Sequence, residues 1–297
     1  MKLAPKISLY FLFTVANWGF ICPVLGQNPA QSSTPQKQQD ENAKKQAFND
    51  GNGLLKLGRH AEALAAYEKA LQIDSTWAKA DYGRGLALKG LRRYPDAIQA
   101  YKNAVRRDPT FGEAYFALGK IHSELEQFDE AISAYRKAVA HQPDSYKAFY
   151  ALGLAYDKKN LHREAAAAFR RARQLEAKSF WAAYMLASTL NKLDEYDAAL
   201  GTVDSVLALK ENLHLVLSLQ AQIYNAKNQP QQALEAAQAA LKAKAGYAHA
   251  AYEAGRALKV LARYDEADVY FHEAAKDRAW KQNVDYELEE LERLREK

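Results

Sequence analysis

The sequence predicts an all-α fold, a solenoid of antiparallel helix pairs followed by one C-terminal helix. Three observations predict it. The sequence repeats every 34 residues from Lys44 to Lys281 without an insertion. Each repeat holds two stretches whose apolar residues recur at helical spacing. Residues typical of turns separate the two stretches.

The first 26 residues have the layout of a secretory signal peptide. A basic start precedes an apolar run over residues 7–16, and Val24-Leu25-Gly26 suits a cleavage site before Gln27. Asn17 interrupts the apolar run, which weakens the alternative of a permanent membrane anchor. We therefore expect an exported protein, periplasmic or secreted, with anchoring by an uncleaved segment as the alternative.

Residues 27–43 are rich in Gln, Ser and Pro and have no apolar face, so we predict a disordered tether there. Cys22 is the only cysteine. The residues Gly19-Phe20-Ile21 lack the small side chain that a lipoprotein signal needs just before its cysteine. A chain cleaved after Gly26 carries no thiol, so packing alone must hold it together.

Small side chains mark seven repeat units, and these cover residues 44–77, 78–111, 112–145, 146–179, 180–213, 214–247 and 248–281. One position is alanine in every unit: Ala63, Ala97, Ala131, Ala165, Ala199, Ala233 and Ala267. A second position is glycine in five units and alanine in two: Gly51, Gly85, Gly119, Gly153, Ala187, Ala221 and Gly255. We expect the two helices of a pair to approach closely at these positions, where a larger side chain would overpack.

A third position holds a large aromatic in five units, Tyr67, Tyr101, Tyr135, Phe169 and Phe271, with Val203 and Ala237 as exceptions. We expect this ring to fill the gap toward the next unit, where its burial stabilises the stack. A single helix pair cannot bury its apolar face alone, so the pairs must stack.

These residues resemble the tetratricopeptide repeat. Phe149-x2-Leu152-Gly153-x2-Tyr156, then Ala165-x3-Phe169, follows that family's pattern with Phe in place of Trp. Pro109 and Pro143 stand at the family's terminal proline. The resemblance covers residues 44–281 and implies a right-handed superhelix whose first helices line a concave side. Units five and six lose the glycine, the aromatic and the proline, so we expect the lowest local stability there.

Residues 282–297 predict a capping helix. Val284, Leu288, Leu291 and Leu294 share one face, and acidic residues precede basic ones, which suits the helix dipole. We expect this helix to cover the open end of the seventh unit. A short coiled-coil dimer is the alternative.

Motifs and charge argue against several classes of protein. Gly51-Asn52-Gly53 starts like a phosphate-binding loop but has neither a third glycine nor a preceding strand. His60 and His162 stand where other units carry a packing aromatic. We therefore predict no catalytic residue, no metal site and no cofactor. The net charge of +5, or +3 after loss of Lys2 and Lys6, is too small to indicate nucleic-acid binding.

The resemblance also implies a binding surface, because five positions of each first helix usually face a bound segment. Ten of these positions are basic and three acidic. The candidate groove residues form an aromatic ladder, Phe48, Tyr82, Phe116, Tyr150, Tyr184 and Tyr252, with a basic set, Lys45, Lys79, Lys120, Lys147, Lys158, Lys192, Arg256 and Lys259. Rigid aromatics are common interface hot spots. The alternative is that the ladder only packs adjacent helices and the lysines form a solvated face.

The sequence thus predicts an exported, non-enzymatic scaffold. Its partner would be a protein or peptide segment with apolar side chains and acidic groups, bound in a basic, aromatic-lined groove. Two alternatives stay open: a glycan or cell-wall binder that stacks sugars on the same rings, and a purely structural subunit of an envelope complex. We expect no nucleic-acid partner, and membrane contact only if the N-terminal segment is not cleaved.

Overall fold

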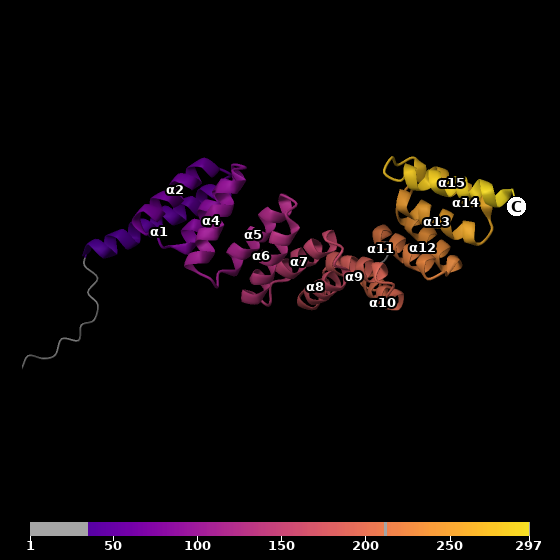
Figure 1. Ribbon diagram of the computed structural model, residues 1–297, viewed down its shortest axis with the longest axis horizontal. Coiled ribbons are helices and arrows are strands. Elements are labelled where there is room, and N and C mark those ends of the chain that lie inside the picture. Colours follow the sequence, from indigo (N-terminus) through magenta and orange to yellow (C-terminus); the bar gives the residue numbers. More distant parts are fainter. Residues whose placement is uncertain (1–34, 211–212, 297) are drawn as a thin grey trace, which may run out of the picture. The chain divides into compact units, whose positions relative to one another are not determined.

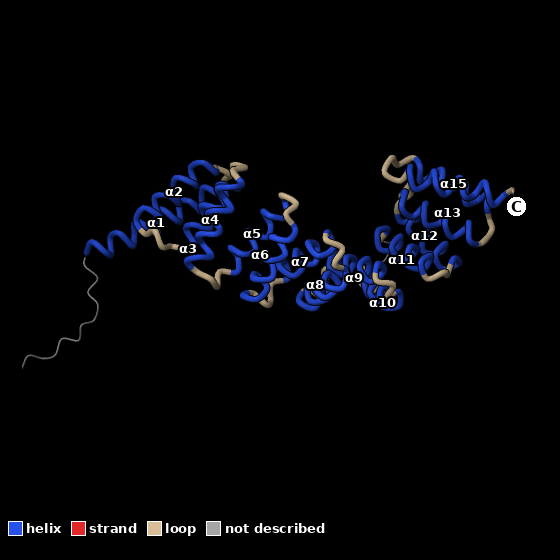
Figure 2. The backbone as a smooth tube through the Cα atoms, viewed as in Figure 1, coloured by secondary structure: helices blue, strands red, loops and turns tan. Residues whose placement is uncertain are grey.

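The computed structural model describes residues 35–210 and 213–296, which form helices joined by loops without a strand (Figures 1 and 2). The signal-peptide prediction for residues 1–26, and residues 27–34 of the predicted tether, lie outside the described residues. The helices are α1 (Pro35–Lys56), α2 (His60–Ile73), α3 (Ala78–Gly90), α4 (Tyr94–Arg107), α5 (Gly112–Glu124), α6 (Phe128–His141), α7 (Tyr146–Lys158), α8 (His162–Leu175), α9 (Phe180–Lys192), α10 (Tyr196–Leu207), α11 (His214–Ala226), α12 (Pro230–Ala243), α13 (Ala248–Val260), α14 (Tyr264–Ala275) and α15 (Lys281–Arg295).

The prediction of a disordered tether is wrong for residues 35–43, which belong to helix α1. Pro35 opens the helix, where its missing N–H costs nothing. Gln36 and Asp40 form a side-chain hydrogen bond one turn apart (2.9 Å), and Lys, Gln and Glu are good helix formers. Residues 35–42 belong to a small N-terminal unit, and a second compact unit begins at Ala43.

Within the second unit the helices pack in a regular order. From α3 onward each first helix contacts the second helix of its own pair, and each second helix contacts the first helix of the next pair (Figure 1). The first helices of pairs two to seven begin at Ala78, Gly112, Tyr146, Phe180, His214 and Ala248, the residues with which the sequence repeats start. The alanine shared by all seven units is fully buried in each of them.

The glycine position makes room for the aromatic ring of the same pair. A Cβ added at Gly153 would lie 2.6 Å from Cε1 of Phe169, and Gly119 and Gly255 meet Tyr135 and Phe271 in the same way. Each of these rings thus packs against the first helix of its own pair. Tyr67 lies between two first helices, because it is next to both Gly51 of its own pair and Gly83 of the next pair, as expected for a ring that fills the gap toward the next unit.

Units five and six replace both partners of this contact together. Where the glycine becomes Ala187, the ring becomes Val203; where it becomes Ala221, the ring becomes Ala237. All four side chains are buried. The added methyl group therefore compensates part of the lost ring volume, and the two departures from the repeat pattern form one complementary change.

The turn inside each pair contains one residue with a left-handed backbone. This residue is Gly58 in the first pair, with φ of 72°, and it is not glycine in the six later pairs: Arg92, Glu126, Asn160, Asp194, Asn228 and Ala262, with φ between 56° and 59°. Side chains other than glycine pay about 1 kcal/mol for this conformation. Asn and Asp tolerate it best.

We therefore expect Ala262→Gly to raise the free energy of unfolding by about 1 kcal/mol, because it relieves the left-handed strain. Gly58→Ala is the matched control, since no atom lies within 4 Å of the added Cβ. It should lower the free energy of unfolding by about the same amount. Urea denaturation followed by circular dichroism measures both. Equal effects of the same sign would contradict this account of the turn.

Helix α15 packs on α14 and α13 as a first helix would in a further repeat. Val284, Tyr286 and Glu287 stand 34 residues after Ala250, Tyr252 and Glu253. Val284 and Leu291 are buried, whereas Tyr286 is exposed. Throughout residues 35–210 and 213–296, no helix has both the length and the hydropathy needed to span a membrane.

Candidate functional site

The aromatic ladder is half-buried. Its rings pack on the second helix of their own pair, and Phe48, Tyr82 and Tyr252 also contact an aromatic residue that follows that helix: Trp77 (4.7 Å), Phe111 (5.2 Å) and Trp280 (4.9 Å). Ring centroids lie 5.7 Å apart for Phe48–Tyr67, 5.8 Å for Tyr82–Tyr101, 5.7 Å for Phe116–Tyr135, 5.7 Å for Tyr150–Phe169 and 6.0 Å for Tyr252–Phe271. Tyr184 has no such ring opposite it and stacks on Phe180 instead (5.9 Å). The ladder thus contributes to packing, and each ring keeps part of its surface accessible.

Burial also decides the charge state of the ladder tyrosines. It raises the pKa of the hydroxyl groups of Tyr82, Tyr150 and Tyr184 above the ordinary value. Burial and the adjacent Glu287 carboxylate raise the pKa of Tyr252 as well. These phenols are therefore neutral hydrogen-bonding groups at physiological pH and add no negative charge to the first-helix surface.

Several basic residues of the predicted groove form ion pairs with neighbouring first helices. Lys192 Nζ on α9 lies 2.7 Å from Asp157 Oδ1 on α7. Lys89 on α3 likewise lies 2.6 Å from Glu124 on α5. These pairs connect the first helices of consecutive repeats, so the basic excess counted from the sequence overstates the free positive charge.

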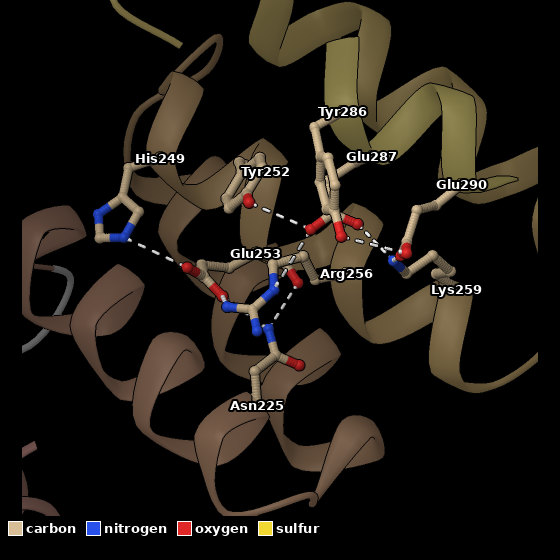
Figure 3. A network of polar contacts seen from close by, with 9 residues as sticks. All are labelled: Asn225, His249, Tyr252, Glu253, Arg256, Lys259, Tyr286, Glu287 and Glu290. Carbon is tan, nitrogen blue, oxygen red and sulfur yellow. Dashed lines mark hydrogen bonds and ion pairs between the residues drawn. The ribbon is translucent and has the colours of Figure 1, made fainter. Parts of the chain in front are cut away.

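The last pair carries a larger network of polar contacts (Figure 3). Lys259 Nζ donates to Glu287 Oε2 at 2.5 Å and to Glu290 Oε2 at 2.8 Å, both on α15. The Tyr252 hydroxyl donates to Glu287 Oε1 at 3.2 Å. Burial lowers the pKa of Lys259, but its bonds to the two carboxylates outweigh burial and hold that pKa above its ordinary value.

Glu253 forms the second half of this network and is only 1% exposed. It accepts from Asn225 Nδ2 at 2.7 Å and lies 3.3 Å from Arg256 Nη1 (Figure 3). His249 Nε2 lies 3.6 Å from its other oxygen. Three of the predicted groove residues, Tyr252, Arg256 and Lys259, are thus engaged within the chain.

Other basic groove residues remain exposed. These are Lys45, Lys79, Lys120, Lys147 and Lys158. Lys120, Lys147 and Lys158 form no ion pair with any residue in the described part of the chain. Lys79 on α3 is likewise in no ion pair within the described residues, so unpaired positive charge is found on α3, α5 and α7.

Helix α7 presents a stripe of side chains that includes three of the predicted groove residues. Lys147, Tyr150, Leu154 and Lys158 are spaced by three, four and four residues, which places them on one helix face. Leu154 and both lysines are exposed, and Tyr150 is half-buried and stacks on Tyr146 at 5.8 Å. This face offers an aromatic edge and an aliphatic side chain between two cations.

The sequence patterns missed a cavity of about 760 Å³ between the ends of α8 and α10 and the starts of α9 and α11. Its apolar lining includes Phe180, Val206 and Leu209. The second groove position carries a hint of it, because lysine there gives way to Trp181 and Leu215 in units five and six. Periodicity alone could not show that Leu215 lines a cavity and that Trp181 stands next to its lining residue Phe180.

Residues that could hold a metal ion are not gathered anywhere in the described ranges: no three His, Cys, Asp or Glu side chains form such a group. The histidines His60 and His162 are partly buried at the start of second helices. His162 Nδ1 lies 3.4 Å from Asp157 Oδ1. The side chains that the structure brings together are thus those of packing, ion pairing and surface recognition.

Tandem helix pairs, stacked through small side chains and aromatic rings, define a helical repeat protein. Tetratricopeptide repeat models match residues 51–77, 82–145 and 116–180. The chain thus contains tandem tetratricopeptide repeats, as its residue pattern predicted. Proteins of this kind are generally non-catalytic adaptors that bind protein or peptide partners.

Solved structures support the same fold. The C-terminal part of a tetratricopeptide repeat protein from Cytophaga hutchinsonii aligns with a TM-score of 0.65 and 17% identity, over 81% of this chain and 99% of that one. YrrB, described as having an unusual peptide-binding site, aligns with a TM-score of 0.59 and 21% identity, over 62% of this chain and 95% of its own. PilF of Pseudomonas aeruginosa aligns with a TM-score of 0.56 and 20% identity, over 71% and 96%.

At these levels of identity the similarity concerns the fold. A comparison with the sequences of curated proteins finds no match. The function must therefore be argued from the residues themselves.

Proposed function

We propose that this chain is an exported, non-enzymatic adaptor that binds an acidic segment of a partner protein along its first helices. The observation that carries the proposal is the α7 stripe, in which exposed Lys147 and Lys158 flank Tyr150 and Leu154. Unpaired cations beside apolar and aromatic surface favour a segment that alternates carboxylates with apolar side chains. Lys120 on α5 extends the positive charge.

The packing of the ladder rings favours this partner over a glycan. Sugars stack on an open aromatic face, whereas Tyr150 is packed between Tyr146 and Phe169. Export is supported by the pattern of residues 1–26, and we propose the periplasm or the extracellular space as the location.

The double variant Lys147→Glu with Lys158→Glu tests the binding surface. We expect it to weaken partner binding at least tenfold, because it reverses two exposed charges without altering a buried contact. Full-length protein and variant are used as baits for the exported fraction of the source organism, and captured proteins are then titrated with purified bait. Binding should also weaken with added salt, since the Debye length falls to about 8 Å at 0.15 M.

Lys69→Glu with Lys102→Glu is the matched control, because both lysines are exposed on second helices, α2 and α4. Equal binding by the two double variants would contradict the proposed surface. Retention on polysaccharide that is insensitive to salt would instead indicate the glycan alternative.

Mass spectrometry of the exported protein should find an N-terminus at Gln27. A chain retained in the cytoplasm with Met1 intact would contradict export.

A further inference from the structure

The cavity near the middle of the array has a preformed wall. Arg173 Nη2 on α8 donates to Ser205 Oγ on α10 at 2.8 Å, which bridges two consecutive second helices. The hydroxyl groups of Ser179 and Tyr146 lie 2.6 Å apart. Phe180 stacks on Tyr184 with an interplanar angle of 25°. These contacts hold one polar and one aromatic side of the cavity in place before any ligand arrives.

The lining is apolar inside and basic at the rim. Val206, Leu209 and Leu213 supply aliphatic surface, and Lys178, Lys210 and Arg173 supply positive charge. No Asp or Glu is among the described lining residues. Burial, and to a smaller degree Lys244, lowers the pKa of His214 below its ordinary value, so this imidazole is neutral at pH 7. The charge that the described lining residues carry is therefore that of three permanent cations.

Local chain geometry explains why the cavity is found here. Helix α10 ends at Leu207 and α11 begins at His214, so six residues connect them, where four connect α6 to α7. On this longer loop Leu209 is 71% exposed. A cavity of this volume is in the range of sites that bind large side chains or small ligands, and exposed apolar surface next to it marks an interaction site.

The cavity adjoins the first-helix surface through its aromatic wall. Phe180 lines the cavity and contacts both Tyr184 of the ladder and Trp181, whose ring centroid lies 4.9 Å away. Trp181 is 53% exposed. Trp181 is not among the lining residues, so a molecule confined to the cavity leaves it in water, whereas a chain segment that continues past the cavity can cover it. The exposed rim thus favours a polypeptide over a small amphiphile.

We infer that this cavity is an anchor site for one bulky apolar side chain of the partner segment, flanked in its sequence by Asp or Glu. The inference rests on the proposed function and adds the residue class that the partner must contain. The apolar side chain enters between Phe180, Val206 and Leu209, and the flanking carboxylates face Lys178, Lys210 and Arg173.

The test uses full-length protein and fluorescein-labelled peptides of sequence Asp-Asp-X-Asp-Asp, with X as Leu, Phe, Trp or Ala. We expect at least one of the three bulky peptides to bind, with the Ala peptide at least tenfold weaker by fluorescence polarisation. Leu209→Glu should weaken the bulky peptide at least tenfold, because it places a carboxylate in the apolar lining. Leu57→Glu is the matched control, since Leu57 is also 71% exposed and lies outside the cavity; it should change binding less than twofold.

Absence of binding by all three bulky peptides, or equal effects of Leu209→Glu and Leu57→Glu, would overturn the anchor site. Binding of decanoate that Leu209→Glu removes, without peptide binding, would overturn it in favour of a small amphiphile. Lys147→Glu with Lys158→Glu separates the two proposals. If that variant loses the captured partner while Leu209→Glu keeps it, the proposed function stands and the anchor site fails. If bulky peptides bind in a way that depends on Leu209, but the captured partner binds both Lys147→Glu with Lys158→Glu and Leu209→Glu as tightly as the unchanged protein, the proposed function fails.

Discussion

Replacing Gly153 by alanine should lower the free energy of unfolding by about 1–3 kcal/mol. The added Cβ would lie 2.6 Å from the Phe169 ring, which is fully buried and cannot move aside. Gly201→Ala is the matched control in another helix, because no atom lies within 4 Å of its added Cβ. It should raise the free energy of unfolding by about 0.5–1 kcal/mol through helix propensity. Urea denaturation followed by far-ultraviolet circular dichroism measures both changes.

A double-mutant cycle makes this prediction sharper. Phe169→Val alone should cost about 2–4 kcal/mol, since it leaves a cavity. The double variant Gly153→Ala with Phe169→Val reproduces the pairing of Ala187 with Val203 in the next unit. Its cost should fall short of the sum of the single costs by at least about 1 kcal/mol. Strict additivity would show that the two positions do not compensate each other.

Glu287→Ala should lower the free energy of unfolding of the C-terminal pair by about 2 kcal/mol. Glu287 is buried, and its carboxylate accepts hydrogen bonds from both Lys259 and Tyr252. Its loss leaves Lys259 partly buried with Glu290 as the remaining carboxylate. Hydrogen exchange should accelerate in α13, α14 and α15, because the last pair frays when its covering helix loosens.

Glu289→Ala is the control on the same helix, because Glu289 is exposed and lies 3.8 Å from Arg293. We expect an effect within about 0.5 kcal/mol. If both variants exchange equally fast, the network in Figure 3 does not hold α15 in place.

The repeat period predicted the fold well because each helix start is set by local pattern. Small side chains at fixed spacing leave one way to stack the pairs, and α3 begins at Ala78 and α13 at Ala248, one and six periods after Lys44. The α1 extension was missed, since the pattern over 35–43 has no apolar face. Its helix is carried by local side-chain bonds such as that of Gln38 to Asn42 (3.2 Å), which composition does not reveal.

The candidate site was harder to predict, because a count of basic and acidic residues does not say which of them lie close enough to form ion pairs. Lys89 and Glu124 are 35 residues apart in sequence yet form an ion pair between neighbouring first helices. The same holds for Lys259 and Glu287, where the acidic partner stands on a helix that the sequence showed only as an apolar cap. The cavity beside Phe180 depends on the path of the loop between α10 and α11, and the 34-residue period does not predict that path.

The matched exchange of Gly153 and Phe169 for Ala187 and Val203 bears on how such arrays are recombined. A crossover that joins the first helix of unit five to the second helix of unit four would place Ala187 against an aromatic ring, and the reverse crossover would place Gly153 against a valine. A crossover between pairs keeps each match intact. The heritable module at this point of the array is therefore the whole hairpin, and chimeras of these two units built at the loop between pairs should be more stable than chimeras built at the turns within pairs.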